Sequence, residues 1–353
     1  MNLLKKHHIY TGDTAFESFI NVLGEVKYTK IMVLTDEHTD KHCYPLIIKY
    51  LPEHFVMTIA SGEAQKNIET CCHIWQKMTE AEMDRHALVI NLGGGVIGDM
   101  GGFCAATYKR GIKFITIPTT LLSMVDASVG GKLGIDFMGF KNHIGVFQEP
   151  EAVIINPVFL KTLPERELKS GYAEVIKHAL IKDASMWDYL KNTNWDEILA
   201  WNIEKWDEII THSVNIKAQI VEADPKEKGI RKILNFGHTI GHAVETYYLN
   251  TPSRLLHGEA IAIGMVIEAF LSYTKGYISE NEYKDIYNYT YKVFVIKPIK
   301  NVNMDDILKY CYQDKKNNFG QLNFSILKEI GNCTFDIKIS DAEIINAMNI
   351  IIS

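Results

Sequence analysis

The chain has 353 residues, which is more than one small hydrophobic core requires and favours two domains. Its 47% of hydrophobic and 23% of charged residues are ordinary for a soluble globular enzyme. The formal net charge of −6, with no compensating basic run, argues against general nucleic-acid binding but leaves room for an anionic small substrate in a locally positive cleft.

Five short apolar runs in the first part of the chain are typical of buried parallel strands. Between the second and the third run, residues 65–83 carry Ile68, Cys72, Trp75 and Met78 at helical spacing. Such alternation predicts βαβ units and a mainly parallel sheet, with ligands at the carboxyl ends of its strands. The five runs are 30–35, 55–60, 87–92, 113–117 and 152–155.

The pattern changes after the Asn-Pro pair at 156–157. Nearly every stretch of residues 165–312 has helical periodicity, and two β-like runs then precede a last helix. We therefore predict an α/β fold in two parts. A Rossmann-like nucleotide domain with a parallel sheet occupies residues 1–160, and a mainly helical metal-binding domain occupies residues 161–353. The helical stretches include 187–210 and 258–273, and the β-like runs are 322–327 and 334–339.

The start of the chain and its cysteines indicate a cytoplasmic protein without a membrane partner. The first ten residues, MNLLKKHHIY, lack the apolar stretch of a secretory signal. The most apolar long segment, 260–270, contains Glu268 and is too short to cross a bilayer. The six cysteines form no C-x-x-C pair, and Cys71 and Cys72 are adjacent in a predicted helix, so we expect buried free thiols.

A glycine-dense turn, GGGVIGD at 93–99, follows the third predicted strand and precedes a helix-like segment. In this context G-x-G-x-x-G lets backbone N–H groups approach a diphosphate at a helix N-terminus. The dinucleotide fingerprint also requires an acid at the end of the following strand, where this chain has Thr119 and Thr120. Phosphate binding and simple packing therefore both stay open. Asp36, which ends an earlier strand, could likewise accept from a ribose hydroxyl or cap a helix.

Two further polar clusters stand where an α/β domain presents loops. They are DASVGGK at 126–132 and KNH at 141–143. The letters GGK resemble part of a phosphate loop. A full P-loop, however, needs four residues between its glycines and a following Ser or Thr, which are absent here.

Three histidines and a glutamate in the predicted helical domain suggest a metal site, because imidazole and carboxylate suit a borderline divalent ion such as zinc. His238 and His242 share one helix face, so spacing alone nominates them as a ligand pair, although HTIGH lacks the zincin glutamate. His257 follows in LLHGEA, and Glu174 lies in the apolar GYAEVIKHAL. The non-functional alternatives are satisfied core histidines and a plain ion pair between Glu174 and Lys177.

Nine motifs in fixed order resemble those of the 3-dehydroquinate synthases, a family of sugar phosphate cyclases, over nearly the whole chain. Two departures, Phe140 for a usual glycine and His143 for a common aliphatic residue, flank the phosphate-side loop. The motifs are SGEAQK (61–66), GGGVIGDMGGF (93–103), YKRGI (108–112), IPTTLLSMVDASVGGKLGID (117–136), KNHIG (141–145), PERELKSGYAEVIKH (164–178), KILNFGHTIGHAVE (232–245), HGEAIAIGM (257–265) and DKK (314–316).

The resemblance implies conversion of 3-deoxy-D-arabino-heptulosonate 7-phosphate to 3-dehydroquinate with release of phosphate, a lyase reaction of the shikimate pathway to aromatic amino acids. NAD acts catalytically in that family: an alcohol is oxidised, phosphate leaves, the ketone is reduced again and the opened sugar closes by an aldol step. The temporary ketone acidifies the adjacent carbon and makes elimination feasible. A divalent metal, zinc or alternatively cobalt, polarises the hydroxyl that is oxidised.

Carried over by position, the resemblance implies Glu174, His238 and His257 as metal ligands, and this set replaces the pair that spacing nominates. His242 then matches the acid–base histidine. Arg110 matches an arginine that reaches the phosphate in the neighbouring subunit, which implies a homodimer. Matches to the substrate's carboxylate and hydroxyls are Asp126, Lys177, Lys217, Arg231 and Asn235, and matches to its phosphate are Lys132, Asn142 and one of Lys315 and Lys316, of which we take Lys316.

Five of the substrate residues are also expected to act in catalysis beside the acid–base histidine: Lys132, Asn142, Lys177, Arg231 and Asn235. The NAD diphosphate and nicotinamide ribose would meet Gly94, Gly95, Val96 and Asp99. The same groove would be lined by Thr119, Thr120 and Lys141, and the adenosine side by Asp36, Glu63 and Lys66.

Another sugar phosphate cyclase would share the metal and NAD motifs, but Asn235 and the lysines of DKK resemble the dehydroquinate branch rather than those relatives. Two further functions compete with this one. A metal-dependent polyol dehydrogenase of related plan would have the same glycine turn and metal helix but would release NADH stoichiometrically. A non-enzymatic nucleotide- and metal-binding relative would lack one or more reactive groups, whereas every matched position here carries a competent side chain.

Overall fold

The computed structural model describes residues 3–138, 140–249, 251–295, 303–313 and 322–351. The chain forms two compact units, Met1–Pro164 with Asn202–Ala218, and Glu165–Trp201 with Gln219–Ser353. Among the described residues we find no helix with both the length and the apolarity that crossing a bilayer requires.

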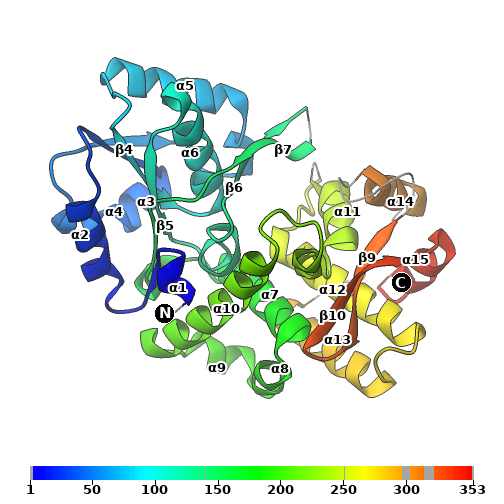
Figure 1. Ribbon diagram of the computed structural model, residues 1–353. Helices are drawn as coiled ribbons and strands as arrows, with labels where there is room; N and C mark the ends of the chain where they lie inside the picture. Colours follow the sequence, from blue (N-terminus) through cyan, green and yellow to red (C-terminus); the bar gives the residue numbers. More distant parts are fainter. Residues whose placement is uncertain (1–2, 139, 250, 296–302, 314–321, 352–353) are drawn as a thin grey trace. The chain divides into compact units, whose positions relative to one another are not determined.

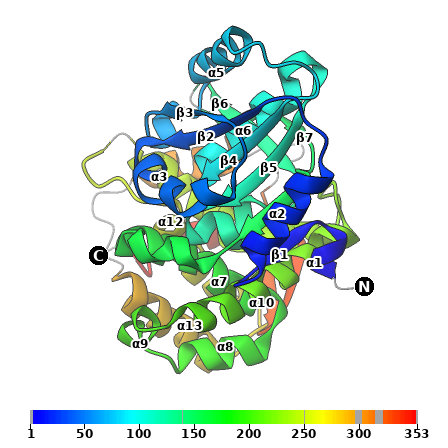
Figure 2. The same cartoon turned by 90° about the vertical axis from the view of Figure 1, so that its left-hand side faces the viewer.

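The first unit is built on a parallel sheet (Figures 1 and 2). Its strand order is β1-β8-β5-β4-β2-β3. All five predicted strands are confirmed, whereas the three-residue edge strand β1 is too short to show a sequence pattern. From the neighbouring strands β2 and β4 the sheet grows toward opposite edges, so their carboxyl ends flank the topological switch point. The strands are β1 (Ile9–Thr11), β2 (Ile31–Asp36), β3 (Phe55–Ile59), β4 (Leu88–Gly93), β5 (Lys113–Pro118) and β8 (Ala152–Ile155).

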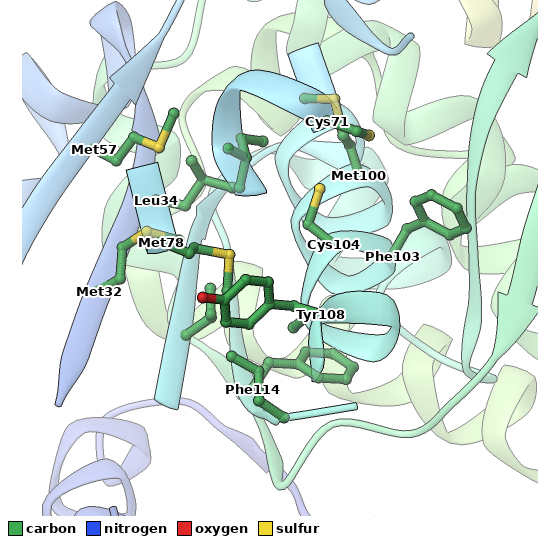
Figure 3. Packing of buried hydrophobic residues seen from close by; sticks show 14 of the residues in the cluster. Met32, Leu34, Met57, Cys71, Met78, Met100, Phe103, Cys104, Tyr108 and Phe114 are labelled. Carbon is green, nitrogen blue, oxygen red and sulfur yellow. The ribbon is translucent and has the colours of Figure 1, made fainter. Parts of the chain in front are cut away.

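Helices α5 and α6 bury their apolar sides with strands β2 to β5 in one core, which includes Met32, Met100 and Phe114 (Figure 3). The predicted helix 65–83 is shorter in the structure, because Asn67 caps it by accepting from the Thr70 N–H at 2.9 Å. The unit's helices are α1 (Leu3–Lys6), α2 (Ala15–Glu25), α3 (Glu37–His42), α4 (Tyr44–Ile47), α5 (Ile68–Glu80), α6 (Gly95–Thr107) and the first part of α10 (Ile203–Ala223).

An antiparallel hairpin of β6 (Lys132–Phe137) and β7 (Phe140–Phe147) stands apart from the large sheet. Sequence patterning does not predict it, because most of β7 is exposed and has no alternation of buried and exposed residues. Short 3-10 helices complete the unit, η1 (Ile48–Tyr50), η2 (Glu63–Gln65), η3 (Tyr108–Arg110) and η5 (Pro157–Thr162), together with the π-helical segment η4 (Ser123–Ala127).

The second unit is mainly helical, as predicted, with a two-stranded hairpin and a last helix at its end (Figure 1). The periodic stretch 187–210 is not one helix, because Asn194 starts a new one with a capping box. The helices are α7 (Glu165–Lys182), α8 (Ala184–Lys191), α9 (Trp195–Leu199), the last part of α10, α11 (His238–Tyr248), α12 (His257–Thr274), α13 (Glu280–Phe294), α14 (Met304–Gln313) and α15 (Asp341–Met348), with the 3-10 helix η6 (Ile230–Asn235) and the strands β9 (Asn323–Glu329) and β10 (Asn332–Lys338).

All six cysteines are free. Five are buried, which confirms the prediction for them, but Cys72 is exposed and the prediction is wrong there. The two neighbours in α5 point in different directions, because successive helical residues lie about 100° apart around the axis. Cys71 therefore enters the core and Cys72 faces solvent.

Glycines allow three helices of the second unit to pack with their backbones in direct contact. A Cβ on Gly264 of α12 would overlap the carbonyl oxygen of Gly237 and lie 2.8 Å from the nitrogen of Gly241 in α11. A Cβ on Gly258 would overlap the carbonyl of Ser170 in α7. These three helices carry the predicted metal ligands, so the absent side chains fix how closely those ligands approach one another.

We expect Gly264→Ala to destabilise the protein by about 1–3 kcal/mol, because the added methyl group forces α11 and α12 apart. Gly24→Ala is the matched control: Gly24 also lies in a helix, and its Cβ would meet no atom within 4 Å. The control should be neutral or stabilising by up to about 1 kcal/mol. Urea unfolding measures the stability of both variants, and equal unfolding midpoints for the two would contradict the prediction.

Candidate active site

The glycines in and after the turn at 93–99 differ in how closely neighbouring atoms approach them. Gly94 is the N-cap of α6, and its carbonyl accepts the Gly98 N–H at 3.0 Å. A Cβ on Gly101 would collide with the side chain of Asn91, so this glycine is required for packing. Gly95, in contrast, has only one neighbour at ordinary contact distance. Packing therefore explains Gly101, whereas phosphate binding at Gly94 and Gly95 stays a prediction.

A pocket of about 370 Å³, counted with its open mouth, lies at the N-terminus of α6. The helix has no acidic side chain in its first turn, so its free N–H groups and dipole favour an anion there. Three predicted NAD residues (Gly94, Gly95 and Asp99) and the predicted phosphate residue Lys132 line it. The other lining residues are Gly93, Gly98, Phe114, Thr116, Ser123, Ala127, Ser128, Gly131, Leu133, Gln148 and Pro150.

A buried lysine connects three segments beside this pocket. The Lys66 ammonium donates to Asp99 Oδ2 and to Asn142 Oδ1, both at 2.6 Å. Burial acts to lower the pKa of Lys66, but the carboxylates of Asp99 and Glu63 outweigh it and raise that pKa. Lys141 lies 3.7 Å from Glu63. Residues assigned to the adenosine side and to the phosphate side are thus joined by one cation.

Asp36, at the end of β2, is the N-cap of α3. Its Oδ1 accepts from the N–H groups of His38 at 2.9 Å and Thr39 at 2.8 Å. The helix-cap alternative is therefore realised, and a carboxylate has further lone pairs for a second partner. Val96, also assigned to the cofactor, is partly buried against the core of the first unit.

Beyond β5, Thr119 and Thr120 are tied to neighbouring segments. The Thr119 N–H donates to the carbonyl of Gly93 at 3.0 Å, and the Thr120 hydroxyl is 2.9 Å from that of Ser123. The end of β5 is therefore fixed against the glycine turn, so the predicted groove residues of both segments share one edge of the sheet.

The remaining predicted residues of the first unit occupy two places. Lys217 of α10 forms a 2.7 Å ion pair with Asp126 Oδ1 and also donates to the carbonyl oxygen of Asp126. Arg110 ends η3 with a positive φ of 71°. Lys315 and Lys316 lie outside the described residues.

The second unit brings all four metal-site candidates together. Glu174 Oε1 lies 3.6 Å from His238 Nε2 and 3.8 Å from His257 Nε2, and this carboxylate is fully buried. Ligand atoms of His238, His242 and His257 also lie within 4.8 Å of one another. The ion pair between Glu174 Oε2 and Lys177 Nζ, the non-functional alternative, is present as well.

The donor set fits a divalent cation, because two imidazoles and a buried carboxylate suit zinc. Burial alone would lower the pKa of His257, but its hydrogen bonds with Glu174 and Glu245 outweigh it and raise the pKa to about 9. The site therefore favours positive charge, as a proton or as a metal ion. Metal binding at such a site must displace the proton from the imidazole.

The histidines are oriented by partners that sequence spacing does not indicate. His257 Nδ1 lies 3.3 Å from Glu245 Oε2, and His238 Nδ1 lies 3.1 Å from the Phe236 carbonyl oxygen. Such contacts fix the tautomer and aim Nε2 at a metal. Glu245 ends the motif KILNFGHTIGHAVE, but its separation of twelve positions from His257 matches no spacing rule.

Two of the predicted substrate residues of the second unit, Arg231 and Asn235, contact one loop. Arg231 donates from Nη1 to the Pro225 carbonyl at 2.7 Å, and Asn235 Nδ2 donates to Glu227 Oε1 at 2.7 Å. Glu227 adopts a φ of +55°, which is uncommon for a residue with a side chain. Sequence reasoning missed Glu227, since nothing in DPKEK marks it as different from a solvated charge run.

Comparison with known proteins covers both units. Residues 56–170 match the family model of the 3-dehydroquinate synthase N-terminal part, and residues 171–317 match that of the C-terminal part. The 3-dehydroquinate synthase of Parabacteroides distasonis is 38% identical over 329 residues, 93% of this chain and 92% of that protein.

Two solved structures are similar as well. One is ValA, the 2-epi-5-epi-valiolone synthase of Streptomyces hygroscopicus subsp. jinggangensis, with NAD+ and Zn2+ bound: TM-score 0.84, 26% identity, 93% of this chain and 92% of that one. The other is 2-deoxy-scyllo-inosose synthase complexed with carbaglucose-6-phosphate, NAD+ and Co2+, with a TM-score of 0.83 at 22% identity over 96% and 95% of the two chains, which supports the fold. The chain belongs to the 3-dehydroquinate synthase family.

Proposed function

We propose that this protein converts 3-deoxy-D-arabino-heptulosonate 7-phosphate to 3-dehydroquinate and phosphate, with catalytic NAD and a divalent metal. The observation that carries this proposal is the approach of Glu174 Oε1 to Nε2 of His238 and His257, at 3.6 and 3.8 Å, in a chain of this family. We assign NAD binding to residues 1–160 and metal and substrate binding to residues 161–353. The relatives solved with NAD+ and a zinc or cobalt ion support this choice of cofactors.

Glu174, His238 and His257 would hold the metal, zinc first and cobalt as the alternative. A bound divalent ion would supply Lewis-acid polarisation of a substrate hydroxyl. The protein's own part is the orientation of the ligands. Because the Phe236 carbonyl can only accept, His238 Nδ1 carries a proton, which leaves Nε2, on the side of Glu174, as the nitrogen that would bind the metal. Burial of the carboxylate excludes water and strengthens its attraction for a cation.

His242 is proposed as the acid–base residue. It lies one turn from His238, with ring centroids 5.2 Å apart, and 5.7 Å from the ring of His257. This is close enough for proton exchange with a group held at those two histidines, directly or through one water.

The substrate is anionic at both its carboxylate and its phosphate, and charge-assisted hydrogen bonds suit it. Around the carboxylate and hydroxyls we propose Asp126, Lys177, Lys217, Arg231 and Asn235, and at the phosphate Lys132, Asn142 and Lys316. For NAD we propose Gly94, Gly95, Val96 and Asp99 with Thr119, Thr120 and Lys141, and Asp36, Glu63 and Lys66 on the adenosine side.

We also propose a cytoplasmic homodimer in which Arg110 reaches the phosphate bound by the other subunit. The six free cysteines are compatible with a reducing compartment. Arg110 follows α6 directly, where the positive φ values of Lys109 and Arg110 turn the chain sharply out of the helix.

The first prediction of this function is phosphate release with substoichiometric NAD. Purified protein given the heptulosonate phosphate and NAD at about one hundredth of the substrate concentration should release phosphate equal to the substrate consumed, because each NADH is reoxidised in the same turnover. Phosphate and absorbance at 340 nm are followed together. NADH that accumulates with substrate loss, without phosphate, would instead establish a dehydrogenase.

The second prediction concerns the metal. We expect Glu174→Ala, His238→Ala and His257→Ala each to lose most of the bound metal, whereas His242→Ala keeps it and loses at least about 100-fold in kcat, since general acid–base catalysis contributes that much. His73→Ala, an exposed histidine in α5, is the control. Elemental analysis after gel filtration measures the metal content of each variant. Metal lost from His242→Ala but kept by Glu174→Ala would replace the ligand set with the three histidines.

The third prediction tests the dimer. Arg110→Ala and Lys132→Ala proteins should each be nearly inactive, and a mixture should regain up to about one quarter of the activity per active site after subunit exchange, because mixed dimers contain one intact site. Exchange is verified by mass spectrometry of differently tagged chains. No recovery after verified exchange would place Arg110 in the site of its own chain.

A further inference from the structure

Glu268 is a fully buried carboxylate in α12, one turn beyond the close-packed Gly264. Its Oε2 accepts the N–H of Gly237 at 2.6 Å, and its Oε1 lies 3.3 Å from the N–H of Ile240. These two amides begin α11, whose N-cap Gly237 has no side chain of its own to satisfy them. Glu268 thus caps one helix from the middle of another.

The same peptide group serves both Glu268 and the proposed metal ligand His238. The Gly237 N–H and the Phe236 carbonyl belong to one planar unit. The N–H donates to Glu268, and the carbonyl accepts from His238 Nδ1 at 3.1 Å. A continuous path of hydrogen bonds therefore runs from the carboxylate through one peptide to the imidazole, whose Nε2 faces Glu174.

This peptide has little freedom to turn. Gly237 has a φ of +79°, which favours glycine, and a Cβ there would lie 2.6 Å from the Met265 side chain of α12. The contacts with α12 therefore set the plane of the peptide. Rotation of the peptide would break its bond to Glu268 and its bond to His238 together.

The charge on Glu268 has two physical effects. A carboxylate at a helix N-terminus is stabilised by the dipole and by charge-assisted bonds, which offsets the cost of burying it. It also polarises the peptide that it binds, because hydrogen bonds in a chain strengthen one another in a low dielectric. The Phe236 carbonyl then becomes a better acceptor, and the imidazole beyond it a more basic ligand.

We propose that Glu268 is a positioning residue for the metal site, acting on His238 through the Phe236–Gly237 peptide. This inference rests on the metal site of the proposed function. The two histidines would then have matched support: His257 contacts the carboxylate of Glu245 directly, at 3.3 Å, and His238 is coupled to the carboxylate of Glu268 through one peptide.

The test is the affinity for Zn2+ and Co2+ of the full-length Glu268→Gln protein, measured by chelator competition. The substitution keeps the shape but removes the charge and places an NH2 group against a backbone donor. We expect affinity to fall by about 10-fold or more, as for other partners of metal ligands. The Co2+ absorption spectrum should change as well, since it depends on the position and basicity of the imidazoles.

A merely structural cap would lower stability without changing the metal affinity. Ile267→Ala controls for this, because Ile267 is the buried neighbour of Glu268 in α12 and packs in the core of the second unit. It should unfold more easily than the wild type yet bind metal normally. If Glu268→Gln does not fold, Glu268→Asp takes its place: it keeps the charge but withdraws it by one methylene, and it should also weaken binding.

The outcomes separate the two proposals. Wild-type protein that binds no metal, or whose binding survives His238→Ala, would overturn the metal site and this inference with it. Wild-type binding that is abolished by His238→Ala but unchanged in the Glu268 variant would overturn the inference alone. Equal losses of affinity in the Glu268 variant and Ile267→Ala would also overturn it, because general destabilisation would then explain both.

Discussion

Burial of an ionised carboxylate is the constraint on which the second unit depends. Glu174 lies in the middle of α7 and has no exposed surface. Burying such a charge is costly unless cations or hydrogen-bond donors surround it. Lys177 on the same helix and the imidazoles of two other helices meet this requirement. The three helices can converge because glycines remove side chains at their contacts. Close packing and affinity for a cation are therefore two results of one arrangement.

In the first unit, glycines of α6 leave backbone N–H groups accessible at the start of the helix and still let the helix pack closely on the sheet. Gly101 fits α6 against the side chain of Asn91, so the helix sits close to its strand. Gly94 and Gly95 leave the first turn of the same helix accessible beside a pocket. Lys66 supplies the positive charge nearby and is itself held by Asp99 and Asn142. One short motif thus combines a close-packed glycine with an accessible helix N-terminus.

The sheet could be predicted from the sequence because strands buried on both faces are continuous apolar runs. The β6–β7 hairpin could not, since its exposed residues have no such period. At the proposed metal site, spacing along one helix indicates His238 and His242 but cannot place Glu174 or His257, which lie on other helices. Their association came from the family resemblance. Glu245 and Glu268 escaped prediction for a further reason: each acts on a histidine of the site from another helix or through a peptide, and helical periodicity encodes neither.

The orientation of Cys72 has a practical consequence. It is the exposed member of six free cysteines, and the other five are buried. Alkylating reagents modify thiols that they can reach, so a maleimide dye should attach to the native protein at one place on α5, without any engineered cysteine. Fluorescence from that dye would report on the first unit while its interior thiols stay unmodified.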